Sequence, residues 1–76
     1  MNRFPSRETV ARVREQYPMG SRVELVSMND PWTHIPEGTK GTVIGVDDTA
    51  TVHVKWDCGS SLGAVYGEDV IRRISV

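Results

Sequence analysis

The segment TVHVKWDCGSSLGAVY, residues 51–66, decides the fold of this chain. In VHVKW (52–56) apolar residues alternate with polar ones, a period of two that is typical of a strand with one buried and one solvated face. The turn DCGS follows, where Gly59 can take the positive φ that closes a three-residue hairpin loop. SLGAVY (61–66) then reads as a second strand, so the segment is predicted to be a β-hairpin that buries Trp56 in the core.

The same kind of pattern continues on both sides of this hairpin. Short runs rich in β-branched residues, separated by Gly, Pro and Asp, predict strands at 21–28, 41–46, 51–56, 61–66 and 70–76. A long loop (29–38) separates the first two strands, DDTA makes a tight hairpin, and GED (67–69) suits a single helical turn. We therefore expect a mainly β fold, a five-stranded SH3-like small barrel whose closing strand pairs with the first and removes open edges. An OB-like barrel is the alternative, but it normally needs longer strands and an inserted helix.

One short α-helix is predicted before the barrel, over residues 7–16. Ser6 is a suitable N-cap, and Pro18 and Gly20 end the helix. Its apolar residues recur on one narrow stripe, formed by Val10, Val13 and Tyr17. Because about ten residues do not form a stable helix alone in water, the stripe must dock on the barrel or on a second copy, giving a monomer or a homodimer.

Length and composition restrict both organisation and function. A chain of 76 residues is one domain, here divided into a helix and linker (1–20) and the barrel (21–76). A core this small has little room for a large substrate cavity, which weighs against an enzyme. One cysteine, Cys58, cannot form an internal disulfide, which favours the cytoplasm. Neither a signal peptide nor a membrane span is predicted.

Four longer motifs resemble a known family when they are taken together. They are YPMGSRVEL (17–25), PEGTKGTVIGVDD (36–48), VKWDCG (54–59) and SSLGAVYGED (60–69). They are similar to short bacterial, phage and conjugative-element proteins grouped as domain of unknown function 4314, over about residues 10–74. The resemblance implies a small β-barrel preceded by a helix, in a mobile-element setting. It assigns no activity, cofactor or catalytic residue.

Reactive residue types in the central hairpin invite a catalytic interpretation, which their positions do not support. Nucleophilic catalysis needs a serine or cysteine beside a base that a third group orients. Cys58 belongs to an exposed turn, His53 points to the solvated face of its strand, and Ser60 and Ser61 suit a turn. The histidines and the cysteine lack metal-ligand spacing. We therefore expect no enzymatic activity, no cofactor and no metal.

The residues best suited to bind a partner lie in loops. By analogy with SH3-like barrels, the long first loop, the turn after the third strand and the last helical turn meet at one end of the sheet. The analogy predicts an aromatic groove with an acidic edge, suited to a protein partner. Its residues would be Trp32, His34, Asp57, Tyr66, Glu68 and Asp69. Trp32 is equally well interpreted as a lid over the small core.

Nucleic acid is the alternative partner. The net charge is −1, yet the first 16 residues are weakly basic through Arg3, Arg7, Arg12 and Arg14, which could contact phosphates. The acidic pair Asp47–Asp48 opposes this, and aromatic residues do not interleave with the arginines. We therefore expect a cytoplasmic, non-enzymatic protein-interaction module, such as a phage or mobile-element accessory that binds and modulates a host protein.

Overall fold

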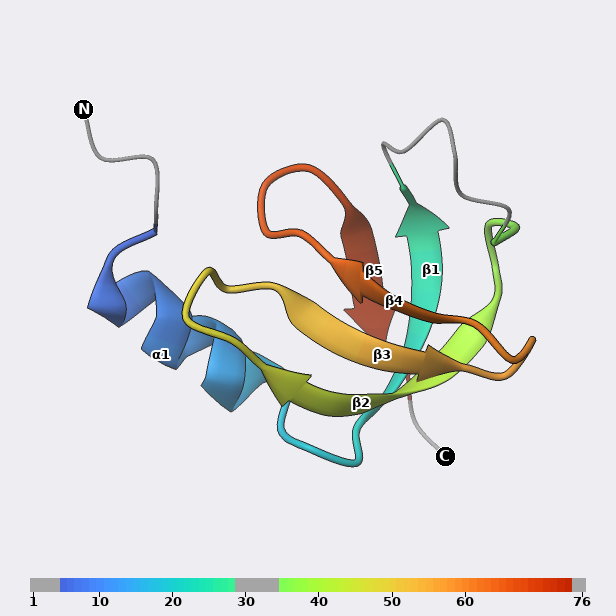
Figure 1. Cartoon of the computed structure of the whole chain (residues 1–76), viewed down its shortest axis with the longest axis horizontal. Coiled ribbons are helices and arrows are strands. Elements are labelled where there is room, and N and C mark those ends of the chain that lie inside the picture. The colour runs from blue at the N-terminus through green and yellow to red at the C-terminus, as the bar shows by residue number, and fades with distance from the viewer. Residues whose placement is uncertain (1–4, 29–34, 75–76) are drawn as a thin grey trace.

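The computed structural model describes residues 5–28 and 35–74 of the chain. It contains α1 (Arg7–Gln16), β1 (Arg22–Ser27), β2 (Lys40–Val46), β3 (Val52–Trp56), β4 (Ser61–Ala64) and β5 (Val70–Arg73) (Figure 1). The predicted class, mainly β with one short helix and five strands, is confirmed. Arg3, Trp32 and His34 from the predicted binding residues lie outside the described part.

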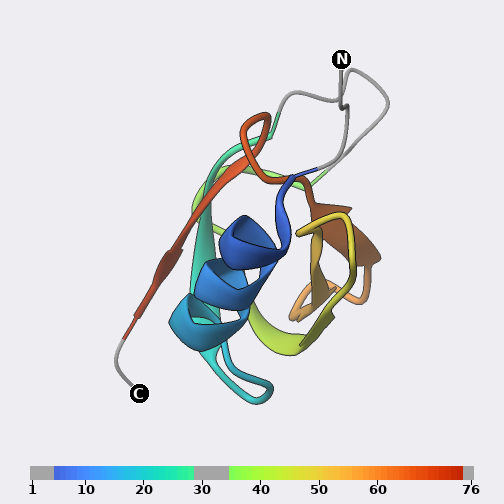
Figure 2. The ribbon, with the colours of Figure 1, turned by 90° about the vertical axis from the view of Figure 1, so that its left-hand side faces the viewer.

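Helix α1 is capped at its start and packs against the sheet. Ser6 is the N-cap, and its side-chain oxygen accepts a hydrogen bond from the backbone amide of Thr9 at 3.1 Å. Val10 and Val13 are buried and Tyr17 packs against the same core, so the apolar stripe docks on the sheet of its own chain. Figure 2 shows α1 in front, between β5 and the hairpin that joins β2 to β3.

All five strands form one antiparallel sheet in the order β4-β3-β2-β1-β5. As predicted, the last strand pairs with the first, with Leu25 opposite Ile71. However, the outermost strands β4 and β5 do not pair with each other, so the sheet is not closed. The expectation that no open edge remains is therefore wrong. In the view of Figure 2, helix α1 appears between these two outer strands, and the loop that joins them appears above the helix.

The core lies on the concave side of this sheet. Its largest fully buried side chains are Trp56, Leu25, Val23, Val43 and Val54. The alternation predicted for β3 is confirmed, since Val52, Val54 and Trp56 are buried while His53 and Lys55 are exposed. The indole of Trp56 donates to the carbonyl oxygen of Leu62 at 3.1 Å, which satisfies its one polar atom inside the core.

Candidate partner-binding pocket

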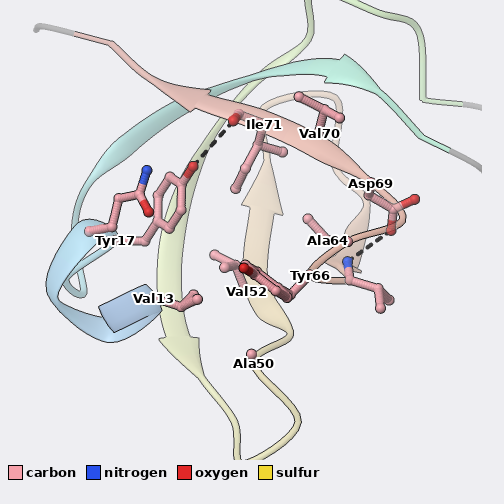
Figure 3. Close-up of a pocket in the computed structure, with 12 residues that line it drawn as sticks. Val13, Tyr17, Ala50, Val52, Ala64, Tyr66, Asp69, Val70 and Ile71 are labelled. Carbon is pink, nitrogen blue, oxygen red and sulfur yellow. Dashed lines mark hydrogen bonds between the residues drawn. The ribbon is translucent and has the colours of Figure 1, made fainter. Parts of the chain in front are cut away.

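A pocket of about 300 Å³ opens between α1, the start of β3 and the segment that links β4 to β5 (Figure 3). Its lining is mainly apolar and comes from three regions that are far apart in sequence. The apolar walls include Val13, Ala50, Val52, Ala64, Val70 and Ile71, and polar atoms come from Gln16, Tyr17, Tyr66 and Asp69. Such a small apolar depression with a few polar groups at its edge suits one large side chain of a ligand.

The first wall is the turn between β4 and β5. The amides of Glu68 and Asp69 donate to the carbonyl oxygen of Val65 at 3.1 and 2.9 Å. These bonds close a tight turn, and the single turn of helix predicted for residues 67–69 is not formed. A carboxylate oxygen of Asp69 accepts from the amide of Val65 at 2.8 Å. Gly67 takes a φ of +85°, a left-handed conformation that suits glycine. This turn leaves the Tyr66 ring 55 % exposed at the edge of the pocket.

The second wall is the hairpin loop between β2 and β3, which Asp47 organises. Its carboxylate accepts from the amides of Thr49 (2.9 Å) and Thr51 (3.1 Å), and it lies 2.8 Å from the ring of His53. Hydrogen bonds from Thr49 and His53 hold the pKa of Asp47 well below its ordinary value. In the same loop Ala50 has a φ of 61° and is fully buried, so its methyl group contributes to the pocket.

From the sequence, Asp47 is interpreted only as a negative charge, and Ala50 is not recognised as a residue of the pocket. The signal for Asp47 was present, because aspartate followed by threonine two and four positions later is typical of a side chain that bonds its own loop. No comparable signal marks Ala50, since a non-glycine residue rarely takes a left-handed conformation.

The third wall is α1, which side chains hold against the sheet. The guanidinium of Arg14 donates to the carbonyl oxygen of Val46 at 3.2 Å and to Asp48 at 3.0 Å. The Tyr17 hydroxyl donates to the carbonyl oxygen of Ile71 at 3.2 Å (Figure 3). Burial raises the pKa of Tyr17, and nearby Arg73 partly opposes this increase. These contacts connect α1 to both halves of the sheet.

Of the predicted binding residues, Tyr66 and Asp69 line the pocket together. Glu68 lies on the same turn, exposed and outside the lining. Asp57 lies elsewhere: the pocket is at the end of β3 where Val52 pairs with Ala64, whereas Asp57 follows the opposite end of that strand. The predicted common groove is therefore wrong for Asp57, because the turn after β3 opens at the far end of the sheet.

Asp57 has a structural partner instead. Its two carboxylate oxygens accept from the guanidinium of Arg22 at 2.9 and 2.6 Å, and the same guanidinium donates to Thr42 at 2.9 Å. The hydrogen bonds from Arg22 lower the pKa of Asp57. This bidentate contact ties the β3–β4 turn to β1, across the intervening strand β2.

The residue types that suggested catalysis lie apart from this pocket. The ring of His53 is bonded to Asp47, and Cys58 is exposed in the turn at the other end of β3. Within residues 5–28 and 35–74, no group of three or more His, Cys, Asp or Glu side chains could hold a metal ion. In the same ranges, no helix has the length and apolar character needed to span a membrane.

The fold and the pocket define a small, mainly β domain with one docked N-terminal helix and an apolar surface pocket. The chain belongs to the family described as domain of unknown function (DUF4314), whose family model matches residues 6–74. Comparison with curated proteins and with solved structures finds no significant match.

Proposed function

We propose that this protein is a non-enzymatic protein-interaction module that binds its partner through the pocket beside α1. The observation that carries the proposal is the apolar surface around the opening. Val65, Tyr66 and Val70 are 37, 55 and 50 % exposed, and all three line the pocket. Exposed apolar side chains next to a concave apolar site are typical of protein-interaction surfaces.

The size of the pocket suggests how a partner is recognised. A volume of about 300 Å³ is at the small end for ligand sites and suits one anchoring side chain of a protein surface. The apolar walls favour a large aliphatic or aromatic anchor, and Tyr66 can cover it from the edge. Tyrosine is one of the residues that most often carries binding energy at protein interfaces.

The biological setting is part of the same proposal. The small size of the chain and its resemblance to phage and conjugative-element proteins support an accessory role in a mobile element. In this role the protein works in the cytoplasm, where it blocks or adapts a host protein. Affinity capture from a bacterial lysate tests this proposal, because it makes no assumption about the partner.

The capture experiment needs two matched variants. Tyr66→Ala removes the exposed ring at the pocket, whereas Ile44→Ala removes a 51 % exposed apolar side chain from β2, outside the pocket lining. We expect the wild type and Ile44→Ala to capture one bacterial protein in similar amounts. Tyr66→Ala should capture at least about tenfold less of it, the effect expected for a binding hot spot. Equal capture by all three proteins, or none by the wild type, would contradict the proposal.

Nucleic acid binding through α1 is the alternative, and the structure gives it less support. Arg14 is exposed but is bonded to Asp48 and Val46, so Arg7 and Arg12 are the exposed arginines of α1 that make no such bond within the described residues. Affinity for mixed DNA and RNA across a salt series separates the two functions. Binding that weakens steeply with salt and is lost in Arg7→Ala/Arg12→Ala would favour nucleic acid over a protein partner.

A further inference from the structure

Within the described residues, strand β4 is paired on one side only. On that side it pairs with β3, and the amide of Trp56 donates to the carbonyl oxygen of Ser60 at 2.8 Å. Along an antiparallel strand, the residues alternate. The amide and carbonyl of one residue bond to the neighbouring strand, and those of the next residue point away from it. Since the carbonyl of Ser60 bonds to β3, the amides and carbonyls of Ser61 and Gly63 point away from β3, toward the unpaired side. Among the described residues, no strand pairs with that side.

The two edges of the sheet are protected very differently. On β5, the hydroxyl of Tyr17 covers the carbonyl oxygen of Ile71, and Arg72 and Arg73 add charge. Charged residues and covering elements are the usual means by which proteins prevent edge-to-edge pairing. The sequence SLGA of β4 has neither charge nor proline. Beyond it, the amide of Val65 is already bonded to Asp69.

We propose that β4 of a second copy occupies this open edge, so that two chains join their sheets across a twofold axis. In this arrangement Ser61 of one chain lies opposite Gly63 of the other and Leu62 lies opposite its own counterpart. The outward groups of Ser61 and Gly63 then form four hydrogen bonds, two from each chain. This interface is independent of the partner-binding function proposed for the pocket.

The shape of this edge and its lack of charge both allow two copies of β4 to pair. Ser61 and Gly63 have small or no side chains and face each other on the outer side of the joined sheet, so nothing bulky separates the backbones. Leu62 is half-buried and packs against the core, and pairing removes more of its surface from water. No charged residue lies in β4, so like charges do not meet across the axis.

The helix stripe offers little surface to a second copy, because Val10 and Val13 are only 6 and 3 % exposed in the single chain. The four-residue length of β4 limits the new ladder, so we expect a dissociation constant in the micromolar to millimolar range. Sedimentation equilibrium of the full chain over about 10 µM to 1 mM covers that range. The average mass should rise from 8.5 kDa toward twice that value.

Ser61→Pro tests the edge directly. Ser61 is the first residue of an edge strand and its amide points away from β3, a position where proline is tolerated. The change removes two of the four proposed hydrogen bonds, so we expect dimerisation to weaken at least about tenfold. Ser61→Ala keeps the amide and should dimerise like the wild type. Circular dichroism verifies the fold of both variants.

Two further measurements keep the test decisive if proline unfolds the hairpin. Ser61→Lys keeps the backbone amide but places one positive charge from each chain beside the axis, one residue from Leu62, and it should also give a monomer. In the wild type, the Gly63 amide should exchange with solvent more slowly at high protein concentration than at low. A wild type that stays monomeric up to about 1 mM, or a dimer that survives both edge substitutions, would overturn the proposal.

Discussion

At the scale of single residues, Gly41 shows how closely the strands approach. A Cβ atom at this position of β2 would lie 2.5 Å from Val54 Cγ1 and 2.9 Å from the carbonyl oxygen of Lys55. Because part of this obstruction is backbone, the site cannot relax by a rotamer change. We expect Gly41→Ala to lower the free energy of unfolding by about 2–3 kcal/mol, measured by urea denaturation.

Gly63→Ala is the matched control for this prediction. A Cβ atom there would also meet an atom at 2.5 Å, but that atom is the methyl group of the half-buried Thr51 side chain, and no backbone atom lies as close as at Gly41. The loss should therefore be clearly smaller than for Gly41→Ala. Equal losses of stability in the two variants would contradict the explanation that contact with the backbone makes Gly41→Ala costly.

Asp47 makes the stability of the β2–β3 hairpin depend on pH. Its pKa is lower in the folded than in the unfolded chain, so its hydrogen bonds contribute fully above about pH 4 and are lost as the pH falls further. The side chain is 42 % exposed, which reduces the effect. We expect Asp47→Ala to cost about 1 kcal/mol at pH 7, and expect the difference from the wild type to narrow below pH 4.

Asp48→Ala provides the control for the pH series. Its carboxylate is 98 % exposed and pairs with Arg14, which is itself 50 % exposed, so this ion pair should contribute less than about 0.5 kcal/mol. Denaturation at several pH values compares the two variants. A constant difference between Asp47→Ala and the wild type down to pH 2 would contradict the role given to Asp47.

At the scale of elements, Tyr17 joins α1 to the edge of β5. Its hydroxyl donates to Ile71, and burial raises its pKa, so the neutral ring stabilises the folded chain below about pH 10 and this contribution is lost at higher pH. We expect Tyr17→Phe to lower the free energy of unfolding by about 1 kcal/mol at pH 7. Above pH 10 the wild type should lose stability faster than the variant. Parallel losses in the two proteins would argue against this role.

Local signals in the sequence predicted the elements well. Ser6 as N-cap and Pro18 with Gly20 after the helix predicted the bounds of α1, and alternation predicted β3, because these features depend on neighbours along the chain. Gly59, with a φ of +96°, has the left-handed conformation expected in the hairpin turn. The separation of Asp57 from Tyr66 was also open to prediction, because their turns stand at the two ends of β4 and therefore at opposite ends of the sheet. The analogy with SH3-like barrels, and not a missing signal in the sequence, misplaced Asp57.

Local signals did not predict the pocket as a whole. Its walls come from α1, the β2–β3 hairpin and the β4–β5 turn, and no spacing along the chain shows that these three meet. The analogy with SH3-like barrels did place Tyr66 and Asp69 together, because Tyr66 ends a predicted strand and Asp69 belongs to the turn that follows it. It did not identify the contribution of α1, since the stripe could equally have docked on a second copy.

At the scale of the whole molecule, α1 belongs to the same core as the sheet. Val10 and Val13 form one buried cluster with residues of β1 to β4, and Arg14 and Tyr17 bond to the carbonyl oxygens of Val46 in β2 and Ile71 in β5. An open sheet of this size has too little core to be stable once one side is uncovered. We therefore regard α1 as part of the folding unit and not as a removable arm.

This view predicts that helix and sheet unfold together. Far-UV circular dichroism follows the secondary structure, including α1, and tryptophan fluorescence follows Trp56, which is 1 % exposed in the core. Trp32→Phe leaves Trp56 as the single tryptophan of the chain. In this variant we expect both signals to change at the same urea concentration, as two-state unfolding requires. If the helical signal is lost first, at a denaturant concentration where Trp56 is still buried, α1 is not part of the cooperative core.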